Sequence, residues 1–327
     1  MYDLVTFGEA LLRLSTPNFM RIEETTGFTL SIGGSELNIA VGASRLGLKT
    51  SWVSRLSSNP LGFLARNKAR EHGVDTSHIV WCENDRMGLY YLEYGASPRS
   101  SNVIYDRKDS SLSRIKPGDV PWESILKGTK VYMVSGITPA LSPSARETTI
   151  ESVAAAKRSG AKVCIDLNYR AKLWPPEEAR QCMTPIMSST DILATTEEDV
   201  LRSLGIKGEN YKELARQLSE RFGIEVVIIT LREDLSVWRN RWTAIAYSKR
   251  RYYETRTYDL EIVDRVGGGD SLVAGFLYGY LQNNLQRALD LGVAFSALKH
   301  THFGDFCWCS IEEAESLVKG GSLRISR

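Results

Sequence analysis

The chain has 327 residues, of which 43% are hydrophobic and 24% charged, a composition typical of a folded protein and not of a disordered one. Its 41 Lys and Arg residues nearly balance its 39 Asp and Glu residues, and the net charge of +2 argues against nucleic-acid or membrane partners. The five cysteines are odd in number and include no C-x-x-C pair, which argues against a disulfide framework and a structural zinc site.

The beginning of the chain does not read as a signal peptide. Residues 1–14 carry Asp3 and Glu9 and lack a basic segment followed by an apolar core. No apolar run approaches the roughly 18 residues of a membrane-spanning helix. We therefore expect a cytoplasmic protein with reduced thiols.

The first elements are a strand, a glycine turn and a helix. Apolar residues between positions 5 and 14 predict one buried strand, interrupted at Gly8 and Glu9. After Gly33 and Gly34 the apolar spacing changes to that of a helix, which ends at Gly47.

This alternation recurs along the chain. Further strands are predicted at Lys49–Leu56, Val131–Ser135, Val163–Leu167, Ile192–Thr195 and Val226–Leu231, and each is followed by helical sequence. Repeated strand-then-helix sequence predicts an α/β fold whose mainly parallel sheet is flanked by helices on both faces. Since no linker-like segment divides the chain, we expect one domain over residues 1–327.

One region departs from the alternation. Leu89–Tyr94 and Asn102–Tyr105 read as two strands without an intervening helix, which is typical of a hairpin. Segments at approximately 15–33 and 86–112 therefore predict a small accessory β-sheet, which would serve as a lid.

Near the C-terminus, three consecutive glycines precede Asp270 and an apolar helix. Gly267, Gly268 and Gly269 allow successive N–H groups to point into one concavity, and the helix N-terminus favours an anion there. Asp270 could cap the helix or accept a proton from a hydroxyl held beside that concavity. The glycines by themselves are equally consistent with a tight turn, because they match neither a Walker loop nor a dinucleotide fingerprint.

This glycine run resembles the D-T-x-G-A-G-D signature of the ribokinase or PfkB-type carbohydrate kinases. Gly33-Gly34-Ser35-Glu36-Leu37-Asn38-Ile39-Ala40 resembles the first signature of that family, G-G-x-x-x-N-x-A. Tyr90, Tyr105-Asp106-Arg107 and Asp166-Leu167-Asn168-Tyr169-Arg170 further resemble its 2-keto-3-deoxygluconate kinase branch.

The resemblance implies a ribokinase-like fold. It also implies ATP-dependent phosphorylation of the terminal 6-hydroxyl of 2-keto-3-deoxygluconate, which gives 2-keto-3-deoxy-6-phosphogluconate. Asp270 is then the general base, and Gly267, Gly268, Gly269 and the Asp270 N–H form the anion hole. Mg²⁺ would arrive with ATP, held mostly by phosphates and water, so no metal site built from protein residues is predicted. The implied substrate-binding residues are Gly34, Asn38, Tyr90, Tyr105, Arg107, Arg170 and Asp305, and the implied nucleotide-binding residues are Asn168, Thr230, Gly267 and Gly269.

A sugar acid offers a carboxylate that suits a guanidinium, for which Arg107 and Arg170 are the candidates. Taken singly, either arginine is better explained by a surface position or an ion pair than by a ligand. The tyrosines are equally well explained by packing of the small sheet.

The sequence departs from the family pattern in four places. Arg265 replaces Thr, Gly268 replaces Ala, Thr196–Asp199 replaces an N-x-x-E element, and Thr230–Glu233 lacks the usual glycine. The alternatives are another sugar kinase of the family, such as a fructokinase or ribokinase, and a non-catalytic sugar or nucleotide sensor.

Two further expectations concern the histidines and the assembly. No chemistry is assigned to the histidines, and His300-x-His302 is interpreted as a surface strand or turn and not as a metal pair. The apolar strands of the small sheet predict a homo-oligomer.

Overall fold

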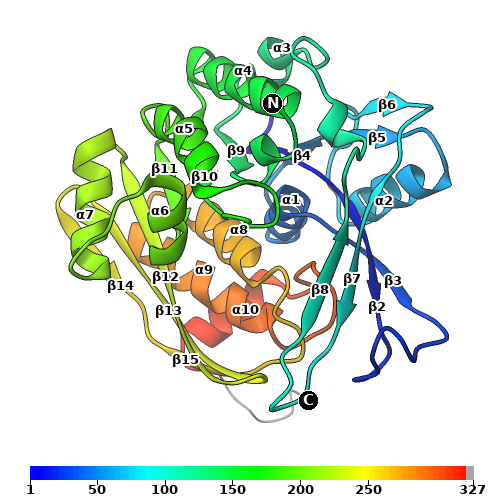
Figure 1. The fold of residues 1–327 in the computed structure, drawn as a ribbon. Coiled ribbons are helices and arrows are strands. Elements are labelled where there is room, and N and C mark those ends of the chain that lie inside the picture. Colours follow the sequence, from blue (N-terminus) through cyan, green and yellow to red (C-terminus); the bar gives the residue numbers. More distant parts are fainter. Residues whose placement is uncertain (322–327) are drawn as a thin grey trace.

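The computed structural model describes residues 1–321 and is built around a nine-stranded sheet (Figure 1). Its order is β14-β13-β12-β11-β10-β9-β1-β4, with β15 also paired to β13. Neighbours from β12 to β4 are parallel, whereas β13 joins β12, β14 and β15 in antiparallel pairs. The strands are β1 (Leu4–Phe7), β4 (Thr50–Val53), β9 (Val131–Ser135), β10 (Lys162–Asp166), β11 (Ile192–Thr195), β12 (Val226–Ser236), β13 (Arg239–Ser248), β14 (Arg251–Glu254) and β15 (Tyr258–Glu261).

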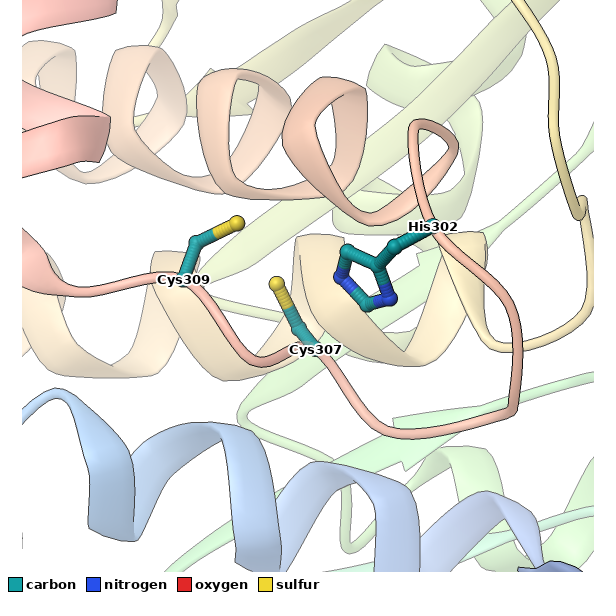
Figure 2. Close-up of side chains that lie close together, drawn as sticks. All are labelled: His302, Cys307 and Cys309. Atoms are coloured by element: carbon teal, nitrogen blue, oxygen red, sulfur yellow. The ribbon is translucent and has the colours of Figure 1, made fainter.

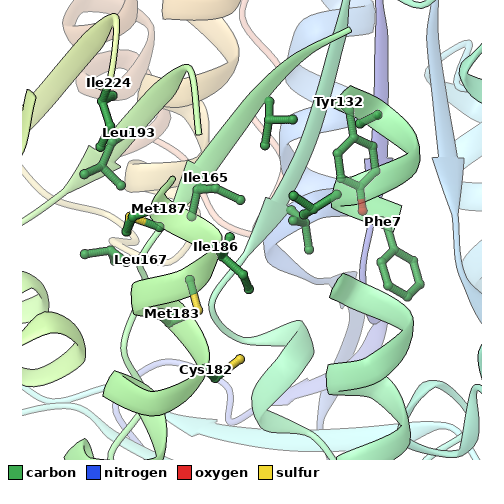
Figure 3. Close-up of a cluster of buried hydrophobic side chains, with 14 of the residues drawn as sticks. Phe7, Tyr132, Ile165, Leu167, Cys182, Met183, Ile186, Met187, Leu193 and Ile224 are labelled. Atoms are coloured by element: carbon green, nitrogen blue, oxygen red, sulfur yellow. The ribbon is translucent and has the colours of Figure 1, made fainter. Parts of the chain in front are cut away.

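Helices cover both faces of this sheet because alternate strand residues point in opposite directions. On β9, Tyr132 and Val134 join a core with the helices α3 to α7, whereas Val131 and Met133 join a second core with α1, α8, α9 and α10. Figure 3 shows part of the first core, where Met183 and Ile186 lie beside strand residues such as Ile165. The helices are α1 (Ser35–Arg45), α2 (Pro60–Glu71), α3 (Trp122–Leu126), α4 (Pro143–Ser159), α5 (Pro176–Met187), α6 (Glu197–Leu204), α7 (Tyr211–Phe222), α8 (Gly268–Tyr280), α9 (Leu285–Lys299) and α10 (Ile311–Val318). The predicted α/β fold class is confirmed.

A separate four-stranded sheet lies on one side of the molecule (Figure 1). Its order is β3-β2-β7-β8, formed by β2 (Leu11–Ser15), β3 (Thr29–Gly33), β7 (Gly88–Glu93) and β8 (Asn102–Asp106). The hairpin predicted from the tyrosine-rich segment is confirmed, since β7 and β8 pair antiparallel.

Two predicted strands are each divided between sheets. Residues 5–14 do not form one strand, because the chain leaves the large sheet after Phe7 and enters the small sheet as β2. Likewise, the segment predicted at Lys49–Leu56 forms β4 of the large sheet and β5 (Arg55–Ser57), which pairs with β6 (Val80–Cys82). Apolar spacing is the same on both sides of each break, so it does not reveal a change of partner strand.

Within residues 1–321, no helix combines the length and the apolar character that crossing a membrane requires.

Candidate active site

A cavity of about 400 Å³ lies where the carboxyl ends of β10 and β11, the start of α8 and the small sheet meet. Carboxyl ends of parallel strands are the usual position for ligand sites in α/β sheets. Every site residue predicted from the sequence lines this cavity: Gly34, Asn38, Tyr90, Tyr105, Arg107, Asn168, Arg170, Thr230, Gly267, Gly268, Gly269, Asp270 and Asp305. The tertiary structure thus brings together groups from both ends of the chain.

Asp270 does not cap its helix. The N-cap of α8 is Gly267, and Asp270 stands in the first helical turn with its side chain turned toward α1. Its carboxylate accepts hydrogen bonds from Ser35 Oγ at 2.7 Å and Asn38 Nδ2 at 2.6 Å. The capping interpretation is therefore wrong. Ser35 and Asn38 of the first family signature fix the carboxylate of Asp270, which belongs to the second signature.

Burial raises the pKa of Asp270, while the hydrogen bonds from Asn38 and Ser35 and the charge of Arg170 oppose that rise. A carboxylate with a raised pKa is a stronger proton acceptor than an exposed one. Asp270 is therefore a buried carboxylate whose pKa is raised, which makes it a candidate general base.

The N-terminus of α8 supplies free backbone donors. Gly268 N–H is used in a 3.3 Å bond to the Arg265 carbonyl, which corrects the expectation that all of the glycine N–H groups are available. Among residues 1–321, the N–H groups of Gly269 and Asp270 have no backbone acceptor. Together with the helix dipole, these two donors suit an anionic oxygen.

Two of the three glycines are required by close approach. Gly267 has φ +83°, and a Cβ there would lie 2.0 Å from the Asp305 carbonyl oxygen. At Gly268, a Cβ would lie 2.4 Å from Cε1 of His300. The imidazole of His300 explains why this chain carries glycine where the family pattern has alanine.

His300 is buried and not on the surface, so the surface interpretation of this residue is wrong. Its Nδ1 lies 2.7 Å from the Ser296 carbonyl, and burial lowers its pKa to about 4. A neutral ring fixed in this way has little freedom to move away from position 268.

Gly268→Ala is expected to destabilise the protein by about 1–3 kcal/mol, because the added methyl overpacks against this fixed ring. The matched control is Gly269→Ala, whose Cβ would meet no atom within 4 Å and should leave the free energy of unfolding unchanged or slightly higher. Urea unfolding of the two variants measures the difference. Equal stability of the two would contradict this role for His300.

Two more carboxylates line the cavity near Asp270. Burial raises the pKa of Asp166, and the charges of Asp199 and Asp270 raise it further. Asp199 also has a raised pKa, mainly from burial, although it accepts hydrogen bonds from Thr196 Oγ1 at 2.8 Å and Tyr169 N at 3.1 Å. Mutually repelling carboxylates beside an anion-binding helix terminus fit the water-mediated coordination that Mg²⁺ prefers.

The altered T-E-E-D element retains a local function. Thr196 caps α6 by accepting a bond from the Asp199 N–H, and both residues line the cavity. Thr230 belongs to β12, which continues without a glycine turn to Ser236 and pairs with β13. The Oγ1 of Thr230 donates to the Thr195 carbonyl at 3.3 Å.

Asn168 is placed by the carboxylates and serine around it. It adopts a left-handed backbone conformation with φ +37°, and its Nδ2 lies within hydrogen-bond distance of Asp166 Oδ2 (3.0 Å) and Ser35 Oγ (3.2 Å). Its amide therefore links the end of β10 to the residue that holds Asp270.

Tyr90 and Asp305 contact each other in the cavity wall. The phenol of Tyr90 lies 2.7 and 2.8 Å from the two carboxylate oxygens of Asp305. Burial and the charge of Asp305 raise the pKa of Tyr90, so the phenol remains the donor. The hydroxyl of Tyr90 is consequently engaged by protein and not turned freely to substrate.

Asp305 is also paired with Arg13, which the sequence analysis missed. Arg13 on β2 is 1% exposed and donates to Asp305 Oδ1 at 2.7 Å, to Tyr94 at 2.5 Å and to Asp264. Burial alone would lower the pKa of Arg13, but the charges of Asp305, Tyr90 and Asp264 outweigh it and raise that pKa. This buried network ties the small sheet to the loop after α9.

Arg107 follows β8 directly and lines the cavity from the small sheet. Its guanidinium forms an ion pair with Glu9 and stands 5.5 Å from the ring centroid of Tyr105. Glu9 also accepts from Ser110, so this acid and the arginine are both fixed. Arg107 is therefore not an unpaired cation, although it lines the cavity.

Arg170 is exposed, and in residues 1–321 no acidic side chain forms a salt bridge with it. It lines both the cavity and an adjoining, larger cavity of about 1400 Å³ between α6 and the β12-β13 pair. Its charge acts on Asp166, Asp199 and Asp270. Arg170 therefore lies where the two cavities adjoin. A residue in that position can contact molecules bound in either cavity.

Several contributing residues escaped the sequence analysis. Ser35, Glu9 and Asp166 lie inside or beside motifs that were noticed, yet their partners are distant in sequence. Glu36 is buried in the first turn of α1 and accepts hydrogen bonds from Ser135 and Thr138. The signal that could have indicated such buried polar residues is an ionisable side chain within apolar sequence, such as Arg13 within Leu11–Ser15.

Comparison with known proteins agrees with this geometry. A model of the pfkB family of carbohydrate kinases matches residues 1–306. The chain is 37% identical over 326 residues to a 2-dehydro-3-deoxygalactonokinase of Haloferax volcanii, covering 99% of each chain. It is 30% identical over 326 residues to a 5-dehydro-2-deoxygluconokinase of Halalkalibacterium halodurans, covering 97% of this chain and 95% of that one. The crystal structure of 2-dehydro-3-deoxygluconokinase from Thermotoga maritima superposes with a TM-score of 0.94 at 40% identity, covering 97% and 99% of the two chains.

The fold and the site define a ribokinase-like phosphotransferase acting on a carbohydrate. The expected resemblance is confirmed over nearly the whole length. The chain belongs to the pfkB family of carbohydrate kinases.

Proposed function

We propose that this enzyme transfers the γ-phosphoryl group of ATP to the 6-hydroxyl of 2-keto-3-deoxygluconate, the compound also called 2-dehydro-3-deoxygluconate. The observation that carries the proposal is the buried carboxylate of Asp270 beside the N–H groups of Gly269 and Asp270, which have no backbone acceptor among residues 1–321. PfkB kinases use ATP, and similar proteins are named as kinases of deoxy keto-sugar acids.

In the proposed reaction, Asp270 accepts the proton of the sugar hydroxyl as that oxygen forms its bond to the γ-phosphorus. The bond from phosphorus to the β,γ-bridging oxygen breaks, and ADP leaves with that electron pair. The N–H groups of Gly269 and Asp270 stabilise the charge on the transferring oxygens, and each such donor contributes about 2.7–4 kcal/mol in comparable sites.

The nucleotide side of the site has its own residues. Asp166 and Asp199 would hold Mg²⁺ through water molecules, and the ion would supply positive charge next to the phosphates. Arg170 would contribute positive charge where the two cavities meet, and Thr230 would line the nucleotide space.

Recognition of the sugar acid requires a cation that lines the cavity. Arg107 is the proposed partner of the substrate carboxylate, with Glu9 holding the guanidinium in place and Tyr105 stacked beside it. Asp305 and Tyr90 complete the wall through their mutual bond, while Gly34 and Asn38 face the sugar hydroxyls.

The test is a coupled ATP-consumption assay with Mg²⁺ on 2-keto-3-deoxygluconate, its galactonate epimer, 5-dehydro-2-deoxygluconate, fructose and ribose. Turnover on the first compound with the highest kcat/KM is expected. A higher kcat/KM on the galactonate epimer, the acceptor in the name of the Haloferax relative, would transfer the assignment to it. Silence on all five would favour a sensor without catalysis.

Arg107→Gln is expected to raise KM for the keto acid by about 10-fold or more, since a charge-assisted hydrogen bond contributes about 1.5–3 kcal/mol. Binding of ATP should be unchanged, because Arg107 does not line the larger cavity. Arg86→Gln is the matched control: this arginine is 41% exposed and pairs with Asp106 on the outer strand of the same sheet. An unaltered KM in Arg107→Gln would remove Arg107 from acid recognition.

We also propose a homo-oligomer formed through the small sheet. Its edge strands expose large apolar side chains to solvent, including Leu30 on β3 and Ile104 on β8. A second copy of the chain covering this surface would bury them.

A further inference from the structure

A second cluster of reactive side chains lies in the loop between α9 and α10. His302, Cys307 and Cys309 each offer one ligand atom, and these three atoms lie within 4.8 Å of one another. Figure 2 shows the two sulfur atoms and the imidazole pointing toward a common space. No residue of the proposed phosphoryl-transfer site belongs to this cluster.

The ligand types favour a thiophilic cation. Two thiolates and one imidazole are the donors that Zn²⁺ takes most often, with Zn–S near 2.3 Å and Zn–N near 2.0–2.1 Å. Neighbouring ligand atoms around a tetrahedral Zn²⁺ lie roughly 3.5–3.8 Å apart at those bond lengths, so the cluster needs to contract by about 1 Å. A side-chain rotation in a loop accommodates such a change.

The imidazole of His302 is set for coordination by its neighbours. Nε2 accepts a 3.3 Å bond from the backbone N–H of Trp308, the residue between the two cysteines. Nδ1 lies 3.3 Å from the Phe303 carbonyl, where a protonated nitrogen donates. With the proton on Nδ1, the lone pair of Nε2 faces the cysteine segment, where a bound cation would replace the Trp308 N–H as its partner. The backbone acceptor on Nδ1 is the second contact that metal-bound histidines normally have.

The cluster has a dry side and an open side. Cys307 is 1% exposed and Cys309 is 8% exposed, whereas His302 is half-buried and its neighbours Phe303 and Trp308 are largely exposed. Without a metal, Cys307 Sγ donates to the Phe295 carbonyl at 3.6 Å, and a cation that displaces the thiol protons would compensate the charge of the two buried thiolates. The exposed side provides the entry path and room for a water as fourth ligand.

The same loop carries a wall of the kinase site. Along the chain, Asp305 lies between His302 and Cys307. Its carboxylate accepts hydrogen bonds from Arg13 and Tyr90 of the small sheet. Gly304 N–H donates to Asp264 at 3.1 Å, and Lys299 Nζ lies 3.3 Å from the His302 carbonyl. A cation bound at both ends of the loop would hold Asp305 in this position.

We propose that Zn²⁺ binds to His302 Nε2 and to the thiolates of Cys307 and Cys309, with water as the fourth ligand, and that it stabilises the loop carrying Asp305. The two thiol protons pass to solvent on binding, so the site keeps its charge balance. The proposal is independent of which sugar the enzyme phosphorylates.

The test uses the full-length protein, reduced and freed of metal with a chelator, and then titrated with Co²⁺ as a spectroscopic probe and with Zn²⁺. One equivalent of Co²⁺ should produce thiolate-to-metal charge-transfer absorption, and Zn²⁺ should abolish it by displacement. Zn²⁺ should also raise Tm, because a ligand that binds only the folded state stabilises it.

Cys309→Ser and His302→Gln are expected to lose both responses, and His302→Gln serves if the cysteine variant does not fold. The matched control is Cys82→Ser, which replaces a half-buried cysteine on β6 and should respond as the unsubstituted protein does. Absence of the absorption from the unsubstituted protein, or its persistence in either ligand variant, would overturn the site. A band without any rise of Tm would overturn the stabilising role of the cation.

Discussion

Asp270→Asn is expected to lower kcat by about 10²–10⁴-fold, because the amide cannot accept the proton of the sugar hydroxyl. The variant should remain folded. Burial raises the pKa of Asp270, which means that the fold disfavours its ionised form, and the neutral amide removes that cost. Single-turnover phosphoryl transfer and urea unfolding measure the two effects.

The pH dependence of the unsubstituted enzyme follows from the same group. Only the carboxylate accepts a proton, so kcat/KM is lost as pH falls through the pKa of Asp270. Since burial raises that pKa above 3.8, the acid loss should begin at a higher pH than for an exposed aspartate.

The control for this variant is Asp259→Asn, which alters an exposed aspartate on β15 paired with Arg239. Its kcat and pH profile should be unchanged. Full activity of Asp270→Asn would disprove its role as base and move that role to Asp166 or another group in the cavity.

Arg13→Met is expected to lower the free energy of unfolding by about 3–5 kcal/mol, because it leaves Asp264 and Asp305 buried without their cation. Methionine fills much of the same space, so the loss reflects charge and hydrogen bonding more than a cavity. The variant should also raise KM for the sugar, since Asp305 loses the partner that fixes it in the cavity wall.

Arg86→Met provides the comparison for stability. Arg86 and Asp106 form an ion pair at 2.7 Å in which both side chains are more than 40% exposed, and such surface pairs contribute about 0–1 kcal/mol. Urea unfolding should therefore show a much larger loss of unfolding free energy for Arg13→Met than for Arg86→Met. Equal stability would show that the buried network around Arg13 does not hold the small sheet to the loop of Asp305.

The sequence by itself determined the family and the fold class, and it predicted residues that the fold gathers in one cavity. The two glycine signatures are local patterns, and each requires its residues at fixed spacing for a backbone turn and a helix start. Alternating strand and helix sequence was equally informative, because each apolar periodicity reports the faces that its own element buries. Each of these features depends only on residues close to one another along the chain, so it can be recognised in a single sequence.

The tertiary structure decided which groups are paired and which are free. On sequence grounds Asp270 could be a cap or a base, and only the structure excludes the cap, because the carboxylate is turned toward Ser35 and Asn38. The pairing of Asp305 with Arg13, 292 positions away, leaves no local pattern. The sequence around Gly268 likewise does not show why glycine is needed there, because the imidazole that excludes a side chain belongs to His300 at the end of α9. Charges and close approaches depend on distances in space, and those distances exist only after the two ends of the chain have folded together.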